Sequence, residues 1–133
     1  MTLDDVLAIV DGVLVTPGVD LAREVGMACG ADLMSDVLAF THSGTLLLTG
    51  LVNPQVVRTA EMADICAIVF VRGKVPPVET VALAEAKGIP LLCSRYTLYE
   101  ASGRLYAAGL PSCGMFDLGA TSWREAFERG TAG

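Results

Sequence analysis

Three short stretches of the sequence combine glycines, hydroxyl groups and positive charges in a way that favours an anionic ligand. Their candidate ligand-binding residues are Thr49, Gly50 and Asn53 in the first stretch, Arg72, Gly73 and Lys74 in the second, and Ser94 and Thr97 in the third. Arg95 also lies in the third stretch, so three of the nine basic residues of a net acidic chain fall here. Each stretch precedes a predicted helix, whose first free amides and dipole favour an anion. The pattern predicts a site for a phosphorylated ligand.

The same residues also have a purely structural interpretation. Asn53 stands before Pro54, which is the order of an N-cap and a first-turn proline. Thr97 is followed three residues later by Glu100, which is the spacing of a capping box. Glycines at strand ends make tight turns whether or not a ligand binds. The sequence therefore leaves two interpretations open, an anion site and an ordinary change from strand to helix.

Motifs for nucleotide hydrolysis and for catalysis are missing from the sequence. The phosphate loop G-x-x-x-x-G-K-[ST] would require a glycine at Ile68 and a hydroxyl residue at Val75. The fingerprint G-x-G-x-x-G of dinucleotide-binding proteins does not occur either. The single histidine, His42, has Ser43 beside it, but no third group is evident that would orient such a pair. We therefore expect that the protein is not an enzyme.

The four cysteines, at positions 29, 66, 93 and 113, include no C-x-x-C pair. This spacing argues against a zinc or iron–sulfur site that forms locally. Cys66 and Cys93 lie within apolar segments, where a thiol packs as a small hydrophobic group. The sequence assigns no role to Cys29 or Cys113, and an oxygen-sensitive metal site built from several cysteines is the weakest alternative.

Three consecutive units, each a strand followed by a helix, must position the candidate residues. Residues 45–50, 66–73 and 89–95 are predicted as strands, and residues 53–64, 76–88 and 97–109 as helices. Strands that are apolar on nearly every residue are buried on both faces, which requires helices above and below the sheet. Alternation with short connections indicates parallel strands and right-handed crossovers. The predicted fold is a three-layer α/β/α domain whose mostly parallel sheet has about five strands.

Parallel strands also predict where the candidate residues meet. Ligands of open parallel sheets bind outside the carboxyl ends of the strands, near the point where the strand order reverses. All three candidate stretches follow predicted strands. We therefore expect them to lie together at the carboxyl edge of the sheet.

The remaining segments complete the prediction of the domains. A short helix is expected near residues 2–11, short strands within VLVTPG and EVGMACGAD, and another helix within LMSDVLAFTH. After Gly109, the segment PSCGMFDLGA is typical of turns, and SWREAFERG is predicted as a short helix. We expect one α/β domain over residues 1–110 and a C-terminal tail over residues 111–133.

The composition restricts the class of protein. Hydrophobic residues make up 53% of the chain and charged residues only 18%, which favours a homodimer interface or a surface for another protein partner. No run of Lys or Arg is present that could neutralise the phosphates of a nucleic acid. Apolar stretches are far shorter than the roughly 20 residues of a membrane helix, and the first residues are acidic rather than basic. We expect a cytoplasmic protein that binds neither nucleic acid nor membrane.

From residue 2 to about residue 110, the order of elements and several motifs resemble the DRTGG domain family. The motifs are Met34-Ser35 before a short helix, a strand that ends in Thr49-Gly50, and a next strand that ends at Gly73 before Pro76. The resemblance implies a fold similar to the amino-terminal domains of HPr kinase/phosphorylase and of the Mur ligases. It also implies a regulatory or sensing role in anaerobic and Gram-positive bacteria, where relatives are fused to CBS domains or phosphotransacetylase or encoded near iron hydrogenase genes.

The sequence departs from the residues that give the family its name. Asn53-Pro54 stands where an Asp-Arg pair would follow the first strand, and Arg72-Gly73-Lys74 stands where Thr-Gly-Gly would end the next. A ligand that the Asp-Arg pair holds in relatives would therefore lose those contacts in this chain. The phosphate loop of HPr kinase belongs to a different domain, so its kinase chemistry is not implied.

Together these observations give two functions from different classes. The first is a non-catalytic regulatory or sensing domain, a homodimer, that binds an adenine nucleotide or another phosphorylated metabolite at the carboxyl edge of its sheet. The alternative is a ligand-free protein-interaction module, accessory to a hydrogenase or other redox enzyme or to a CBS-type regulator. Neither function requires a catalytic residue or a metal ligand.

Overall fold

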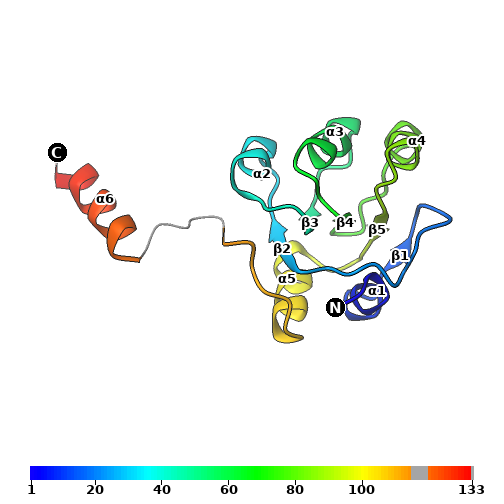
Figure 1. Cartoon of the computed structure of the whole chain (residues 1–133), viewed down its shortest axis with the longest axis horizontal. Coiled ribbons are helices and arrows are strands. Elements are labelled where there is room, and N and C mark those ends of the chain that lie inside the picture. The colour runs from blue at the N-terminus through cyan, green and yellow to red at the C-terminus, as the bar shows by residue number, and fades with distance from the viewer. Residues whose placement is uncertain (115–119, 133) are drawn as a thin grey trace.

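The computed structural model describes residues 1–114 and 120–132, with side chains for residues 1–114 and 124–130. In chain order, its elements are α1 (Leu3–Ile9), β1 (Val13–Leu14), β2 (Met27–Gly30), α2 (Met34–Phe40), β3 (Thr45–Thr49), α3 (Pro54–Met62), β4 (Ala67–Phe70), α4 (Val78–Lys87), β5 (Leu91–Cys93), α5 (Leu98–Ala107) and α6 (Ala120–Ala132) (Figure 1). The strands and helices predicted within residues 1–110 are all present, with ends that differ by a few residues.

The five strands form one sheet in the order β1-β5-β4-β3-β2. β2, β3, β4 and β5 run parallel, whereas β1 runs antiparallel to β5 and pairs Val13 with Cys93. At the centre of the sheet, Leu47 of β3 pairs with Ile68 of β4. The prediction of a three-layer α/β/α fold with a mostly parallel sheet is confirmed.

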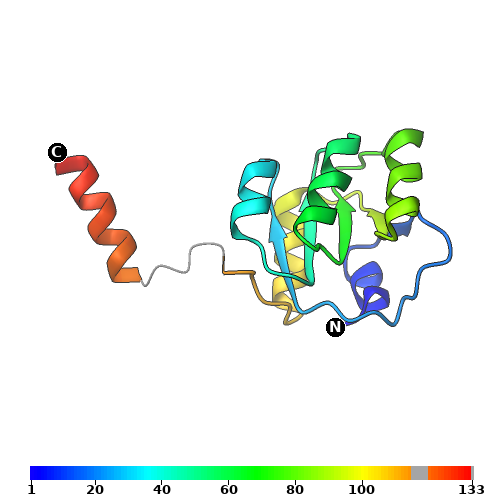
Figure 2. The ribbon, with the colours of Figure 1, turned by 45° about the horizontal axis from the view of Figure 1, so that its top comes forward.

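Helices cover both faces of this sheet. α2, α3 and α4 lie on one face, and α1 and α5 lie on the other (Figure 1, Figure 2). Every residue of β3 and β4 is buried. Leu46 and Leu48 pack in a hydrophobic cluster with α1 and α5, whereas Leu47 packs in a second cluster with α2, α3 and α4. The continuous apolar runs of the sequence are explained by these two cores, because β3, β4 and β5 each contribute to both.

The chain reverses its direction across the sheet after β5. The connections that leave β2, β3 and β4 lead to helices on one face, and the connection that leaves β5 leads to α5 on the other. After α5, the chain pairs in parallel with the outer edge of β2, where Ala28 is opposite Ser112. Ala28 N donates to Pro111 O at 2.9 Å, and Cys113 N donates to Ala28 O at 3.0 Å. The connections of the neighbouring strands β4 and β5 thus diverge, which makes this pair the switch point of the sheet.

The C-terminal tail contains α6, whose described side chains, residues 124–130, are exposed. The division of the chain after residue 110 stays a prediction, although residues 111–113 at the start of the tail contact β2. Within the part of the chain that the structure describes, no helix has both the length and the apolar character needed to cross a lipid bilayer.

Candidate functional site

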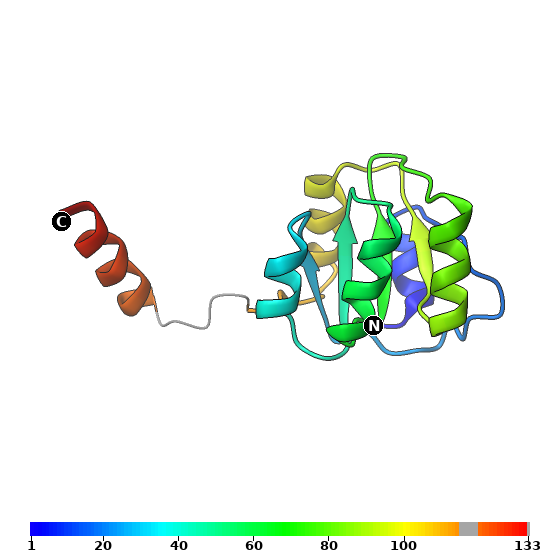
Figure 3. The same ribbon diagram turned by 90° about the horizontal axis from the view of Figure 1, so that it is seen from above.

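The predicted site residues all lie at the carboxyl edge of the sheet. Because β3, β4 and β5 are parallel, the loops that follow them emerge at the same edge of the sheet. Figure 3 shows the arrows of β3 and β4 pointing toward this edge. This edge brings together the candidates from all three stretches, which are Thr49, Gly50, Asn53, Arg72, Gly73, Lys74, Ser94 and Thr97. The hydrogen bonds of each group decide whether it remains free to contact a ligand.

The loops after β4 and β5 are hydrogen-bonded to each other across the switch point. Arg72 N donates to Tyr96 O at 2.7 Å, and Gly73 N donates to Ser94 O at 2.9 Å. Arg72 and Gly73 both have left-handed backbone, with φ angles of 61° and 66°, which glycine adopts readily and arginine rarely. These two backbone amides are therefore occupied by the fold rather than free for an anion.

Two of the predicted hydroxyl groups also have structural roles. Ser94 is buried, and its Oγ donates to Val10 O at 2.7 Å and accepts from Tyr96 N at 3.2 Å. Thr97 Oγ1 accepts from Glu100 N at 3.2 Å, so Thr97 caps α5 as the sequence predicts. For these two side chains, the hydrogen bonds favour the structural interpretation of the pattern.

Arg72 connects the ends of β3 and β4 through its side chain. A Cβ atom added to Gly50 would lie 2.5 Å from Nη2 of Arg72, so the guanidinium group crosses the backbone at Gly50. A larger residue at position 50 would displace this group. The guanidinium group of Arg72 therefore lies at the end of β3, next to Gly50, at the carboxyl edge of the sheet.

An acidic residue that the sequence pattern missed completes this edge. Asp32, in the loop after β2, accepts hydrogen bonds at 2.9 Å from both Thr49 Oγ1 and Gly50 N. Thr49 Oγ1 in turn accepts from Leu51 N at 3.2 Å. The signal that could have identified Asp32 is its position directly after a predicted strand, at the same edge as the other candidates. Because its negative charge repels an anion, we expect a phosphorylated ligand to lie nearer to β4 than to β2.

Asn53 occupies the N-cap position of α3 without capping the helix. The predicted position is correct, but the predicted hydrogen bond is wrong, because the Asn53 side chain makes no bond to the first turn. The orientation of a cap side chain depends on its tertiary surroundings, which the order Asn53-Pro54 does not encode. The exposed amide of Asn53 and the uncapped N-terminus of α3 therefore remain available to an anion.

Two of the three basic residues at this edge have no acidic partner among the residues that the structure describes. Arg95 pairs with Asp11, with Nε and Oδ2 3.2 Å apart, and this hydrogen bond raises the pKa of Arg95 above its ordinary value. Arg72 and Lys74 are both exposed, and neither forms a salt bridge with any residue that the structure describes. Their charges are therefore free to pair with a ligand.

The contrast between the caps of α3 and α5 predicts a difference in stability. Thr97→Ala removes a capping hydrogen bond, so we expect it to lower the free energy of unfolding by about 1 kcal/mol. Asn53→Ala removes no such bond, so we expect a loss of at most roughly 0.3 kcal/mol. Urea denaturation followed by circular dichroism measures both values. Equal losses in the two variants would show that Asn53 does cap α3 in solution.

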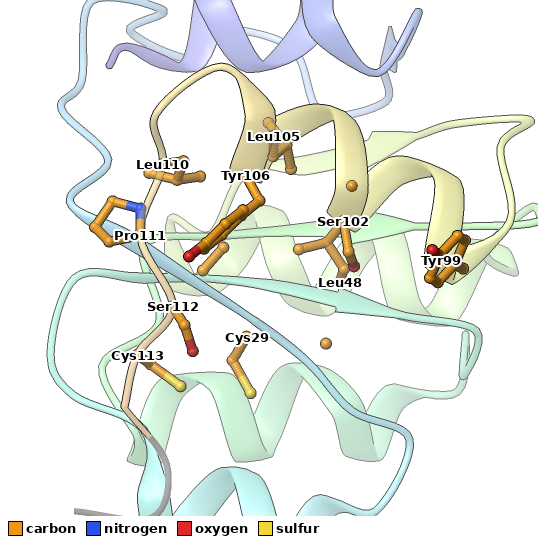
Figure 4. A pocket seen from close by; sticks show the side chains of 13 residues that line it. Cys29, Leu48, Tyr99, Ser102, Leu105, Tyr106, Leu110, Pro111, Ser112 and Cys113 are labelled. Atoms are coloured by element: carbon orange, nitrogen blue, oxygen red, sulfur yellow. The ribbon is translucent and has the colours of Figure 1, made fainter.

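A separate pocket of about 420 Å³ lies beside α5 (Figure 4). α5 forms one wall, and β2 with residues 110–113 forms the other. Cys29 and Cys113 are both buried here, and burial, together with the neighbouring Cys113, raises the pKa of Cys29 to about 12. No group of three metal-ligating side chains occurs among the described residues, and the four cysteines are free thiols.

The fold belongs to the class of open, mostly parallel sheets in α/β/α layers. It is similar to the crystal structure of the CBS and DRTGG domains of the regulatory region of Clostridium perfringens pyrophosphatase, complexed with the activator diadenosine tetraphosphate. The TM-score is 0.66 at 16% sequence identity, and the match covers 90% of this chain and 51% of that chain, so this chain spans about half the length of the chain it matches. No protein-family model and no curated protein matches the sequence. The likeness shows a shared fold.

Proposed function

We propose that this protein is a non-catalytic regulatory domain that binds an adenine nucleotide or another phosphorylated metabolite at the carboxyl edge of its sheet. The observation that carries the proposal is the exposure of Arg72 and Lys74, at the switch point, without a salt-bridge partner among the described residues. The chain has a net charge of -6, so two cations without a described acidic partner, at the edge of the sheet where α3 begins uncapped, are a local exception. Such a local positive field favours a negatively charged ligand.

The likeness to the pyrophosphatase regulatory region supports this proposal. That structure contains diadenosine tetraphosphate, an activator with adenine bases and phosphates. The match covers about half of that chain, and we propose that this half corresponds to its DRTGG domain, as the motif resemblance implies. Because Asn53-Pro54 replaces the Asp-Arg pair of the family, we expect the contacts with a phosphorylated ligand to come from β4 instead.

The surroundings of the single histidine support a non-catalytic role. Ser43, next to His42, donates its hydroxyl hydrogen to Asp64 rather than to the imidazole. A serine nucleophile needs a base at this hydroxyl, and the base in turn needs a group that orients it. We therefore propose that the domain binds its ligand without changing it.

A thermal-shift screen tests this proposal. The probes are ATP, ADP, AMP, diadenosine tetraphosphate and tripolyphosphate, and sodium chloride at matched ionic strength is the control. A ligand at about one hundred times its Kd adds about 2.7 kcal/mol of stability, or roughly 5–10 °C in Tm for a domain of this size. A screen in which no probe raises the Tm above the salt control rejects the proposal.

Exposed apolar side chains favour a protein-interaction module as the second candidate. Leu33 and Leu38, at α2, and Val75 and Val78, at the start of α4, are large apolar residues with exposed side chains. Such residues fit the interface of a homodimer, or of a complex with a redox enzyme such as a hydrogenase or with a CBS-type regulator. Light scattering and co-purification from the native host distinguish the candidates. A stoichiometric protein partner without any nucleotide-induced shift supports the module.

A further inference from the structure

α5 contains a glycine that the fold does not require. Gly103 is exposed in the middle of the helix, and a Cβ atom added there would have no described neighbour within 4 Å. Glycine inside a helix is destabilising relative to alanine, so Gly103 weakens α5 without a packing reason. Gly30 differs, because a Cβ atom there would lie 3.1 Å from Leu98 Cδ1. The bare backbone at Gly103 leaves space for a molecule outside the fold.

Two tyrosines flank this bare backbone. Tyr99 lies four residues before Gly103 and Tyr106 three residues after it, so all three lie on one face of α5. Tyr99 is 88% exposed and Tyr106 is 71% exposed, and both line the pocket beside α5. Figure 4 shows them on either side of Ser102, which also lines the pocket. Exposed aromatic rings in this arrangement offer flat faces to a ligand.

Among the residues that the structure describes, the lining of this pocket contains no charged side chain. The wall opposite α5 is formed by Ala28, Cys29 and Gly30 together with Ser112 and Cys113. The raised pKa of Cys29, about 12, keeps its thiol protonated near neutral pH. The volume of about 420 Å³ falls within the roughly 300–1,000 Å³ of small-molecule sites. These properties fit an uncharged molecule with a flat, partly apolar surface.

One end of the pocket lies at the same edge of the sheet as the basic residues. β2 ends there at Gly30, and α5 begins there next to Tyr99. The loop after β2 leads to Asp32, which bonds to Gly50 N beside the guanidinium group of Arg72. The pocket and Arg72 are thus connected along one edge of the sheet through the loop after β2, which is the path that an elongated ligand would take toward β4.

We propose that the pocket beside α5 is a subsite for an uncharged planar heteroaromatic ring, the base of a nucleotide, which lies against Gly103 between Tyr99 and Tyr106. This inference rests on the proposed function, which places the phosphates of the same ligand at the two free cations of the carboxyl edge. Every base has an aromatic face that can stack on tyrosine. The pocket therefore selects a flat, neutral ring rather than one particular base.

Calorimetric titration of the full chain with three probes tests the base subsite. Adenosine presents the base without phosphate, tripolyphosphate presents phosphate without the base, and ATP presents both. Gly103→Leu fills the pocket from a position where an added Cβ atom has open space. The control Ala108→Leu adds the same side chain at the exposed C-cap of α5, on another side of the helix and outside the pocket lining. We expect Gly103→Leu to weaken adenosine and ATP binding by about 10-fold or more and to leave tripolyphosphate binding unchanged. Ala108→Leu is expected to change none of the three.

A second variant, Tyr99→Ala, removes an aromatic face instead of filling the pocket. Because the Tyr99 side chain is 88% exposed, we expect this substitution to leave folding unaffected. We expect the same pattern as for Gly103→Leu, with weaker adenosine and ATP binding and unchanged tripolyphosphate binding. If neither Gly103→Leu nor Tyr99→Ala lowers the affinity for adenosine, the base subsite is overturned.

The outcomes of these titrations separate the subsite from the proposed function. Tripolyphosphate binding without adenosine binding overturns the subsite and leaves the phosphate site standing. If the chain binds adenosine but not tripolyphosphate, and Gly103→Leu abolishes the adenosine binding, the subsite is supported and the phosphate site is rejected. If none of the three probes binds, both proposals are overturned. Analytical ultracentrifugation covers one further outcome. If the chain self-associates, Gly103→Leu abolishes the self-association and the chain does not bind adenosine, the pocket is an interface between copies and the subsite is overturned.

Discussion

Replacing Arg72 and Lys74 together with alanine is expected to weaken tripolyphosphate binding by about 100-fold, which corresponds to about 2.7 kcal/mol. A hydrogen bond to a charged group contributes roughly 1.5–3 kcal/mol. Because solvent screens both exposed side chains, we expect the total binding energy from the two residues to be smaller than the sum of two such bonds. The effect is expected to be large because neither cation is paired with a carboxylate in the described part of the chain. Calorimetric titration at fixed ionic strength measures the loss.

The double variant Arg58→Ala with Lys87→Ala is the matched control for this experiment. It changes the net charge of the chain by the same amount, but at positions away from the carboxyl edge. Arg58 is exposed on α3, and Lys87, at the end of α4, pairs with Glu61, with Nζ and Oε2 3.1 Å apart. A phosphate site at the edge predicts little change in this control. Equal losses in the two double variants would mean that only the overall charge attracts the phosphates.

The largest effect on stability is expected for Phe70→Ala, which should lower the free energy of unfolding by about 3–5 kcal/mol. Phe70 is fully buried on β4, the central strand, in the cluster that the sheet forms with α2, α3 and α4. Removing the ring leaves a cavity that the surrounding strands fill only in part. Urea denaturation measures the loss. Met62→Ala, at a residue that is 63% exposed on α3, is the control and is expected to stay within about 0.5 kcal/mol of the parent chain.

The same substitution is expected to affect the candidate site. Phe70 lies two residues before Arg72, and Phe70 O accepts a hydrogen bond from Ser94 N at 2.9 Å. A shift of β4 would therefore move both loops of the switch point, so we expect weaker tripolyphosphate binding together with the loss of stability. A stability loss below about 1 kcal/mol would contradict this prediction, because it would show that the neighbouring side chains close the cavity.

The central strands could be predicted from the sequence, whereas the pairing at the sheet edges could not. β3, β4 and β5 are continuous apolar runs bounded by glycines and polar residues, a pattern that is typical of buried parallel strands. The antiparallel pairing of β1 and the pairing of residues 111–113 with β2 have no such local signal. Both depend on contacts between distant residues, Val13 with Cys93 and Ala28 with Ser112.

The location of the candidate site follows from the sequence, but the availability of its groups does not. Parallel strands bring their carboxyl ends together, and this placed the candidates at one edge. Which groups are occupied depends on distant partners, since Ser94 donates to Val10 and Arg95 pairs with Asp11, each across 84 positions of the sequence. Asp32 is one acid among several without a ligand pattern. Its position after a predicted strand is a weak signal, and its role is evident only from its hydrogen bonds to Thr49 and Gly50.

Residues 111–113 and β1 protect the two sides of the sheet from strand addition. Beyond β2, Pro111 lacks the amide that a further strand would need, and Ala28 already bonds to Pro111 and Cys113. On the opposite side, β1 has only two residues, which is too short to template another strand. Copies of this chain are therefore expected to resist edge-to-edge stacking into fibrils at high concentration, and to assemble with partners through helices and loops.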